Sequence, residues 1–214
     1  MRRSGAQIKP HRAFDPRLVG TLECQVWVAY YRREWLRFLC GALSLTRHAF
    51  GLPWPATVYG AWLVLRANQL WAPFPDNDPD SARRAIGRFY ALVKRRHGER
   101  FDPAEAARLE VEWWRVHREH QHTDQTATPN NPTDQDAVIH ADERPLVEAL
   151  TALYSYAYQV PGADVRVAAE QRALAMRYSD RWVREGCKQD SPLIDLERAA
   201  LVRSYAGLLA GVHR

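Results

Sequence analysis

Cysteine and lysine are both scarce in this chain of 214 residues. The three cysteines, at positions 24, 40 and 187, lie far apart and form no C-x-x-C pair. That pattern argues against a disulfide framework or a zinc ribbon and indicates reduced thiols in a cytoplasmic protein. Three of the 30 basic residues are lysines and the other 27 are arginines, which suit buried ion pairs or the recognition of anions. A GC-rich coding sequence explains the same bias without any binding role.

Motifs that mark common enzymes and nucleotide-binding proteins are missing as well. The chain has no G-x-S-x-G sequence, no phosphate-binding loop and no dinucleotide-binding fingerprint. Its first residues, MRRSGAQIKPHRAFDP, are charged and contain no apolar run, so no secretory signal is visible. Asn-Gly hairpin turns and a sustained alternation of apolar and polar residues are also absent, which argues against β-strands.

One long stretch lacks charge and could suggest a membrane protein. The segment AFGLPWPATVYGAWLVL, residues 49–65, has no charged residue over 17 positions and reaches the lower limit for a membrane span. Gly51, Pro53 and Pro55 near its start shorten the continuous helix, so we expect a buried central helix instead. The formal net charge of +5 argues for solubility. We therefore expect neither a membrane nor a nucleic acid as a partner.

Proline marks the start of four predicted helices. Asp15, Asp78, Asp102 and Ser191 each precede a proline, which puts a capping side chain at the N-cap and proline at the first helical position. Together with the spacing of apolar residues, these starts predict a single-domain, all-α bundle of about seven helices. The predicted helices span residues 16–47, 55–71, 79–97, 103–121, 143–159, 164–186 and 192–212.

The chain outside these helices divides into an N-terminal segment and one long loop. We expect a flexible N-terminus over residues 1–14 and a helical domain over residues 15–214. A polar linker loop interrupts this domain at about residues 123–140 and should be exposed. Residues 123–136 support this prediction because, apart from Pro129 and Pro132, they carry no apolar side chain larger than alanine.

Two patterns resemble metal sites, and both are incomplete. Asp76, Asp78 and Asp80 have the spacing of the first ligands of an EF-hand, but Ser81 stands where that loop needs glycine. A di-metal carboxylate bundle needs two Glu-x-x-His pairs, and this chain has one clean pair, which begins at Glu119. We therefore expect no metal ion and no cofactor.

The helix predicted at 103–121 carries most of the candidate chemistry. At about 100° per residue, Glu110, His117 and His120 fall on or beside the apolar stripe that includes Trp113. Ionised groups that face an interior need partners, and catalytic roles collect among such groups. Glu110 and His117, with Asp180 from a later helix, are therefore the candidate catalytic residues. A structural, hydrogen-bonded role for Glu110 and His117 is the simpler explanation.

The predicted partners of these residues come from other helices. Glu110 and His117 lie two turns apart, so each should find its partner elsewhere: an arginine for Glu110, and Asp180 or Glu34 for His117. We also expect the first, second and fourth predicted helices to form the central packing. Four tryptophans should then be largely buried, namely Trp27, Trp35, Trp62 and Trp113.

The function predicted from these features is the binding of a small anionic or aromatic ligand in a polar, aromatic interior pocket. Whether the protein is also an enzyme stays open. The candidate ligand-binding residues are Glu34, Arg66, Asn68, Trp113, His120 and Arg172. The alternative is a helical protein-interaction or regulatory module whose tryptophans and arginines serve an interface, since these residues dominate binding hot spots. A ligand would shift the thermal stability of the protein, whereas a partner protein would co-purify with it.

Overall fold

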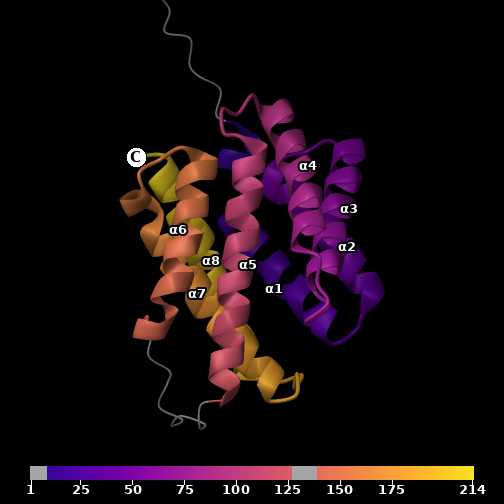
Figure 1. Ribbon diagram of the computed structural model, residues 1–214, viewed down its shortest axis with the longest axis vertical. Coiled ribbons are helices and arrows are strands. Elements are labelled where there is room, and N and C mark those ends of the chain that lie inside the picture. The colour runs from indigo at the N-terminus through magenta and orange to yellow at the C-terminus, as the bar shows by residue number, and fades with distance from the viewer. Residues whose placement is uncertain (1–8, 127–138) are drawn as a thin grey trace, which may run out of the picture.

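The protein is an assembly of α-helices (Figure 1). The computed structural model describes residues 9–126 and 139–214, with side chains described for 9–122 and 139–214. Over these residues it contains eight α-helices and two short 3-10 helices and no β-strand, so the predicted all-α fold is confirmed. The elements are η1 (Pro10–Arg12), α1 (Pro16–Tyr31), α2 (Trp35–Phe50), α3 (Trp54–Trp71), α4 (Pro79–His97), α5 (Pro103–Thr126), η2 (Ala141–Glu143), α6 (Arg144–Tyr158), α7 (Gly162–Arg184) and α8 (Pro192–Val212).

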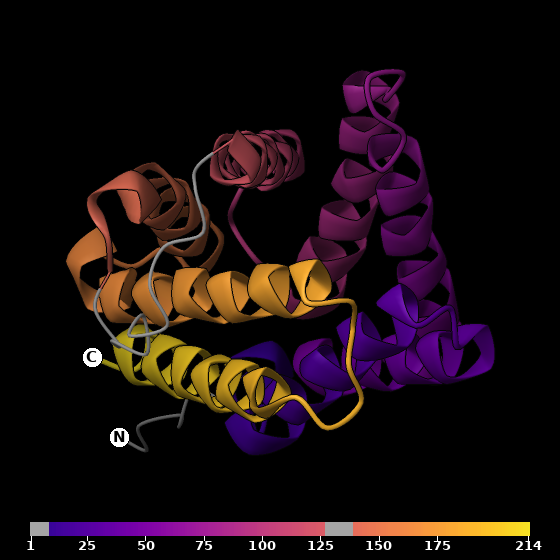
Figure 2. The ribbon, with the colours of Figure 1, turned by 90° about the horizontal axis from the view of Figure 1, so that it is seen from below.

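Helices α7 and α8 lie side by side, and α1 packs along α8 (Figure 2). On the other face of α7 lies α6, followed by α5 and then by α4. The pair α3 and α4 stands across the direction of α7 and α8 at one side of the molecule. Gly20 permits the close approach of α1 to α8, because a Cβ atom at this position would lie 2.7 Å from the backbone nitrogen of Val202.

The first predicted helix, residues 16–47, is broken into α1 and α2. The break lies at Arg33, whose φ of 60° is left-handed, and Glu34 follows as the residue before α2. Aromatic rings gather around this elbow: the ring centroid of Tyr30 lies 6.2 Å from that of Trp35 and 5.7 Å from that of Phe38. A straight helix of this length would separate these rings, so their packing accounts for the bend.

The predicted helix starts are confirmed where aspartate or serine precedes proline. The Asp15 side chain accepts hydrogen bonds from the backbone of Arg17 and Leu18, and Asp78 accepts one from the backbone nitrogen of Ser81 at 2.9 Å. Ser191 caps α8 in the same way. Within the described residues, no group of three His, Cys, Asp or Glu side chains is placed to hold a metal ion. Asp78 is the N-cap of α4, and Asp80 lies in its first turn.

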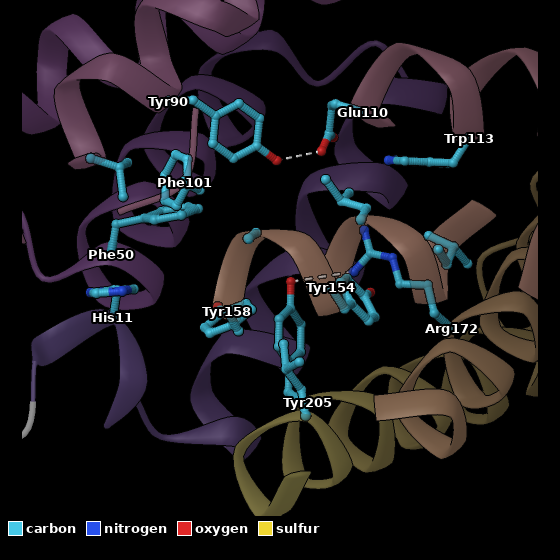
Figure 3. Close-up of a pocket in the computed structure, with 15 residues that line it drawn as sticks. His11, Phe50, Tyr90, Phe101, Glu110, Trp113, Tyr154, Tyr158, Arg172 and Tyr205 are labelled. Atoms are coloured by element: carbon cyan, nitrogen blue, oxygen red, sulfur yellow. Dashed lines mark hydrogen bonds between the residues drawn. The ribbon is translucent and has the colours of Figure 1, made fainter. Parts of the chain in front are cut away.

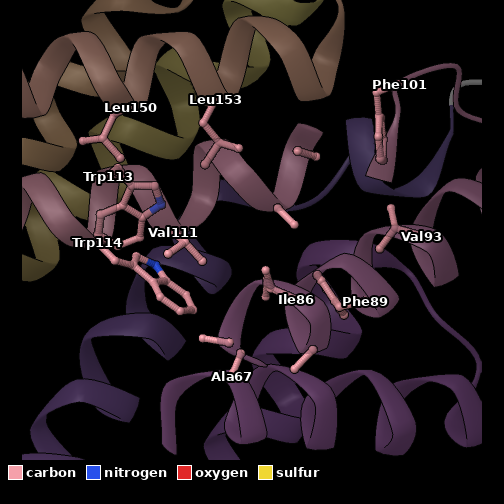
Figure 4. Close-up of a cluster of buried hydrophobic side chains, with 14 of the residues drawn as sticks. Ala67, Ile86, Phe89, Val93, Phe101, Val111, Trp113, Trp114, Leu150 and Leu153 are labelled. Atoms are coloured by element: carbon pink, nitrogen blue, oxygen red, sulfur yellow. The ribbon is translucent and has the colours of Figure 1, made fainter. Parts of the chain in front are cut away.

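The largest buried cluster lies between α3, α4, α5 and α6 (Figure 4). Trp113 and Trp114 of α5 pack there, with Leu150 and Leu153 on one side and Phe89 on the other. A second cluster joins α1, α7 and α8 around the fully buried Trp182, whose indole N–H donates to the carbonyl oxygen of Lys188 at 2.8 Å. Both clusters fill the space between helices that pack against one another.

The prediction of four buried tryptophans is wrong for two of them. Trp113 is buried and Trp27 is half-buried, but Trp35 is 55% exposed and Trp62 is 52% exposed. Trp35 lies at the elbow between α1 and α2, and Trp62 lies on the side of α3 that faces away from α4. The central packing expected of the first, second and fourth predicted helices is also not found: α3 joins α5 in the largest buried cluster, whereas α1 packs mainly on α8 and α2. The helix within residues 49–65 is thus not a buried central helix.

None of the helices described here combines the length and the apolar character that crossing a membrane requires. The uncharged stretch that raised this question supplies most of α3, which is interrupted by polar residues toward its end.

The N-terminal residues 9–14 pack against the rest of the molecule. His11 and Phe14 are buried, and Lys9 and Arg12 both bind the carboxylate of Glu99, at 2.8 and 2.9 Å. Burial acts to raise the pKa of Glu99, but hydrogen bonds from Arg12 and Lys9 outweigh it and leave the pKa below its ordinary value. Of the predicted flexible segment 1–14, residues 1–8 lie outside the described residues.

The predicted polar loop also lies mainly outside the described residues. Helix α5 continues to Thr126, and the description resumes with Ile139, which precedes η2. The first four residues of the predicted loop, residues 123–126, are therefore helical.

Glu197 is a buried carboxyl without a complete set of partners. It lies in α8, and its Oε2 atom has no hydrogen-bond partner among the described residues. Burial, together with the negative charges of Glu23 and Asp180, raises the pKa of Glu197 to about 8. In the folded protein Glu197 therefore holds its proton at pH values where an unfolded chain has lost it.

We expect the variant Glu197→Gln to be more stable than the natural protein at pH 8. Because the folded-state pKa is raised, the stability of the natural protein is full below the unfolded pKa and falls as the pH rises toward 8. The amide removes this loss, which should amount to about 2–4 kcal/mol. Thermal unfolding at pH 5 and pH 8 measures it. An equal difference between the two proteins at both pH values would contradict this assignment.

Candidate functional site

The candidate site is a cavity of about 190 Å³ between α4, α5, α6, α7 and α8 (Figure 3). His11 of the N-terminal segment and Phe50 of α2 lie at one end of it, and Trp113 and Arg172 lie at the other. Aromatic rings form much of the wall. Polar groups of the lining come from Tyr90, Glu110, Trp113, Tyr154, Arg172 and Tyr205.

Glu110 of α5 turns its carboxyl group toward the cavity (Figure 3). The hydroxyl of Tyr90, from α4, donates to Oε2 of Glu110 at 2.7 Å. Burial raises the pKa of Glu110, although the hydrogen bond from Tyr90 and the charge of Arg172 oppose this. Burial also raises the pKa of Tyr90, so this hydroxyl keeps its proton and stays a donor. The two helices are thus joined at the cavity by a carboxyl group whose charged form is disfavoured.

Among the described residues, the indole N–H of Trp113 has no hydrogen-bond partner. Its side chain is buried and lines the cavity one turn beyond Glu110 on α5. The indole N–H lies near the Glu110 carboxyl and helps to hold its pKa down, yet it does not reach hydrogen-bonding geometry. A buried donor without a partner is costly, and a bound molecule could accept from it.

Arg172 of α7 is a cavity residue that already has its counter-ion. Its guanidinium binds the carboxylate of Glu23, from α1, through two hydrogen bonds, of which Nη1 to Oε2 measures 2.7 Å. The hydroxyl of Tyr205 donates to the same Oε2 at 2.5 Å. Burial acts to lower the pKa of Arg172, but the charge of Glu23 outweighs it and keeps this pKa well above its ordinary value. The guanidinium therefore carries its positive charge, and the carboxylate of Glu23 balances that charge.

His117 belongs to a separate polar cluster on the same helix. Its Nε2 atom lies 3.0 Å from Oδ2 of Asp180, and Nε2 of Gln121 donates to Oδ1 of Asp180 at 2.6 Å. None of these three residues lines the cavity. The predicted partner Asp180 is therefore the one that His117 has, and the predicted arginine for Glu110 is replaced by Tyr90 as its hydrogen-bond partner. Glu110 and His117 do not act on one site.

The structure brings three of the predicted site residues to the cavity: Glu110, Trp113 and Arg172. The others lie elsewhere. Glu34 binds Arg37 at 3.0 Å near the elbow, because the helix that would have aligned it with the interior is broken there. Arg66 is exposed, and the Asn68 side chain donates to the carbonyl oxygen of Val64 within α3. His120 Nδ1 lies 3.8 Å from Asp142 Oδ2.

Several residues of the site were not predicted from the sequence. Tyr90, Tyr154, Tyr158 and Tyr205 supply hydroxyl groups around the cavity, and Glu23 neutralises Arg172. Two sequence signals point to them in retrospect. Residues 154–158 read YSYAY, which places two tyrosines one helical turn apart. Glu23 is the one charged residue between positions 18 and 31, and a lone carboxylate in an apolar helix needs a buried partner.

Comparison of the chain with protein-family models, with curated proteins and with solved structures found no match.

We expect His117→Ala to cost about 1–3 kcal/mol of stability, because Asp180 then keeps Gln121 and loses its imidazole partner. Metal content should not change. Urea denaturation and elemental analysis measure the two quantities. His48→Ala is a suitable control, since His48 is exposed, and it should change the stability by less than about 0.5 kcal/mol. Loss of a stoichiometric metal in the His117 variant would contradict the structural role.

Proposed function

We propose that the protein binds a small, uncharged aromatic molecule in the cavity between α4 and α8. The observation that carries this proposal is the unused indole N–H of Trp113 in a cavity walled by aromatic rings. Ligand sites are typically apolar cavities in which a few placed polar groups fix the orientation of the ligand. The cavity has this composition, with Trp113 as a free donor and Glu110 as a polar group beside it.

The volume of the cavity limits the size of the ligand. A cavity of roughly 150 Å³ in an engineered protein accommodates benzene. At about 190 Å³ this cavity suits a single aromatic ring with substituents, or a small fused pair of rings. The rings of Tyr154, Tyr158 and Phe101 would provide the stacking and edge contacts that such ligands favour.

The charges around the cavity favour a neutral ligand over an anionic one. Arg172 is its strongest cation, but Glu23 already occupies the guanidinium with two hydrogen bonds. An anion would have to displace that carboxylate, which would then be left buried without its partner. A carbonyl or ring-nitrogen acceptor on a neutral molecule can bind the Trp113 N–H and leave the ion pair intact.

The proposal is for binding and includes no reaction. Glu110 is a carboxyl group with a raised pKa, which a general acid also needs. Histidine is represented in the cavity lining by His11, and Figure 3 places it at the end away from Glu110. Burial lowers the pKa of His11 to about 4, with His97 adding to the effect, so it is a neutral ring in the wall of the cavity.

A second candidate function is an interaction module that uses surface tryptophans and arginines. The observation that favours it is the exposure of Trp35, Trp54 and Trp62 on α2 and α3. Exposed apolar patches often mark interaction sites, and tryptophan is enriched among the residues that contribute most to binding at protein interfaces.

We expect benzimidazole, whose ring nitrogen can accept from the Trp113 N–H, to raise the melting temperature, and benzoate to have no effect. At a tenfold excess over the dissociation constant, a ligand that binds the folded state adds about 1.4 kcal/mol, or roughly 3–5 °C for a protein of this size. Differential scanning fluorimetry with isothermal titration calorimetry measures this shift and the affinity.

A cavity-filling variant provides the control for this experiment. Ala157→Leu places a larger side chain in the wall without removing a polar group, and it should abolish the shift. Ala152→Leu makes the same change at an exposed position of α6 and should retain the shift. Two results would contradict the proposal: no shift with any neutral ring, or a shift with benzoate that Ala157→Leu abolishes.

A further inference from the structure

Helix α3 is apolar on all sides, yet only one side of it is covered. Within Trp54–Trp71 the polar side chains are Thr57, Arg66, Asn68 and Gln69. One face packs on α4 through Gly60 and Leu63, and a Cβ atom at Gly60 would lie 3.2 Å from the ring of Phe89. A helix of this composition is normally buried all round. The face of α3 opposite α4 therefore lacks a cover in the structure.

The uncovered face consists of large side chains at helical spacing. Trp54, Val58 and Trp62 follow one another at intervals of four residues and are 56%, 53% and 52% exposed. Tyr59 stacks on Trp62, with 6.0 Å between the ring centroids, and is exposed as well. We call these four residues the outer face of α3. Single exposed apolar residues are ordinary, but a row of this length on one helix marks a binding surface.

The charged residues of α2 and α3 are all arginines, of which Arg37 is paired with Glu34. Residues 35–75 contain no aspartate or glutamate, and their charged residues are Arg37, Arg47 and Arg66. The guanidinium of Arg47 lies 4.4 Å from the ring centroid of Trp54, and Arg66 lies one turn beyond Trp62. Leu36 and Leu39 of α2 are also exposed. The preferred partner is therefore apolar and anionic.

This charge distribution argues against a second copy of the chain as the partner. In a symmetric dimer built on the outer face, the same arginines would approach one another from both subunits, and like charges across an interface are unfavourable. A negatively charged lipid surface has the opposite property. It attracts arginines at the headgroups and accepts apolar side chains into the boundary with the acyl chains.

The type of aromatic residue also fits a lipid surface. Tryptophan and tyrosine are enriched where membrane and water meet, because each combines an apolar ring with a polar N–H or O–H group. The outer face uses these two residues rather than phenylalanine. We propose that the outer face of α3 docks the protein in the plane of an anionic membrane surface, with Trp54 and Trp62 inserted at the headgroup level and Arg66 bound to lipid phosphates. This inference does not depend on the ligand proposed for the cavity.

Vesicle sedimentation with purified full-length protein tests the proposal. We expect binding to vesicles of phosphatidylcholine with phosphatidylserine, little binding to phosphatidylcholine alone, and weaker binding as the salt concentration rises from roughly 0.1 to 1 M. Tryptophan fluorescence should shift to the blue on binding. Val58→Ser/Trp62→Ser should reduce the partition coefficient by at least about tenfold. Arg66→Glu should reduce binding to anionic vesicles and make its dependence on the anionic lipid content shallower.

Matched variants elsewhere on the surface serve as controls. Val167→Ser removes an exposed valine from α7, and Arg100→Glu reverses an exposed arginine between α4 and α5. Both should bind vesicles as the natural protein does. Far-UV circular dichroism and the melting temperature establish that each variant is folded.

Three outcomes would overturn the proposal. The first is equal binding to neutral and anionic vesicles, or binding to neither. The second is binding to anionic vesicles that folded Val58→Ser/Trp62→Ser retains in full. The third is a dimer in light scattering that Val58→Ser/Trp62→Ser converts to a monomer, because the outer face would then be covered by a second copy.

Discussion

The buried ion pair between Arg172 and Glu23 is the interaction on which the rest of the structure depends. It joins α7 to α1, and the hydroxyl of Tyr205 brings α8 to the same carboxylate. Breaking such a pair by removing one partner leaves a buried charge without compensation, which typically costs about 3–5 kcal/mol. The pair therefore fixes how three helices meet. It also decides the character of the cavity, since the one guanidinium that could recruit an anion there is already occupied.

The abundance of arginine has a structural use in this light. The described part of the chain buries the glutamates Glu23, Glu99, Glu143 and Glu197. Arg172 binds Glu23, and Arg12 binds Glu99. Arg177 binds Glu143 through two hydrogen bonds of 2.7 Å. The planar guanidinium suits such two-point contacts better than a lysine ammonium does. Oε2 of Glu197 has no hydrogen-bond partner among the described residues, and burial raises the pKa of this carboxyl group. The base composition of the coding sequence and these contacts are compatible explanations of one bias.

Local chemistry could be predicted from the sequence, and long-range packing could not. Asp15 and Asp78 mark their helices because a cap and a proline act within one turn. The bend at Arg33 depends on rings of α1 and α2 that meet only after the chain has folded back, so no local signal reveals it. Periodicity placed Glu110 inward correctly but gave no information on which helix it faces. The same limit explains why Trp62 was wrongly predicted to be buried. Helical spacing shows that a face is apolar, but it does not show whether another helix covers that face.

Helix α4 lies between the two surfaces that carry the functional proposals. Phe89 packs toward Gly60 of α3, and the next residue, Tyr90, directs its hydroxyl to Glu110 in the cavity. Successive residues on a helix point about 100° apart, so α4 can serve both neighbours at once. The ring of Phe89 also meets Phe50 edge-to-face with 4.9 Å between centroids, which ties the end of α2 to the same point. Because protein interiors are close-packed, the position of the Tyr90 hydroxyl depends on how tightly α3 sits against α4. The outer face of α3 is one helix thickness away from that contact, so substitutions there alter the surface without entering the packing that holds the cavity.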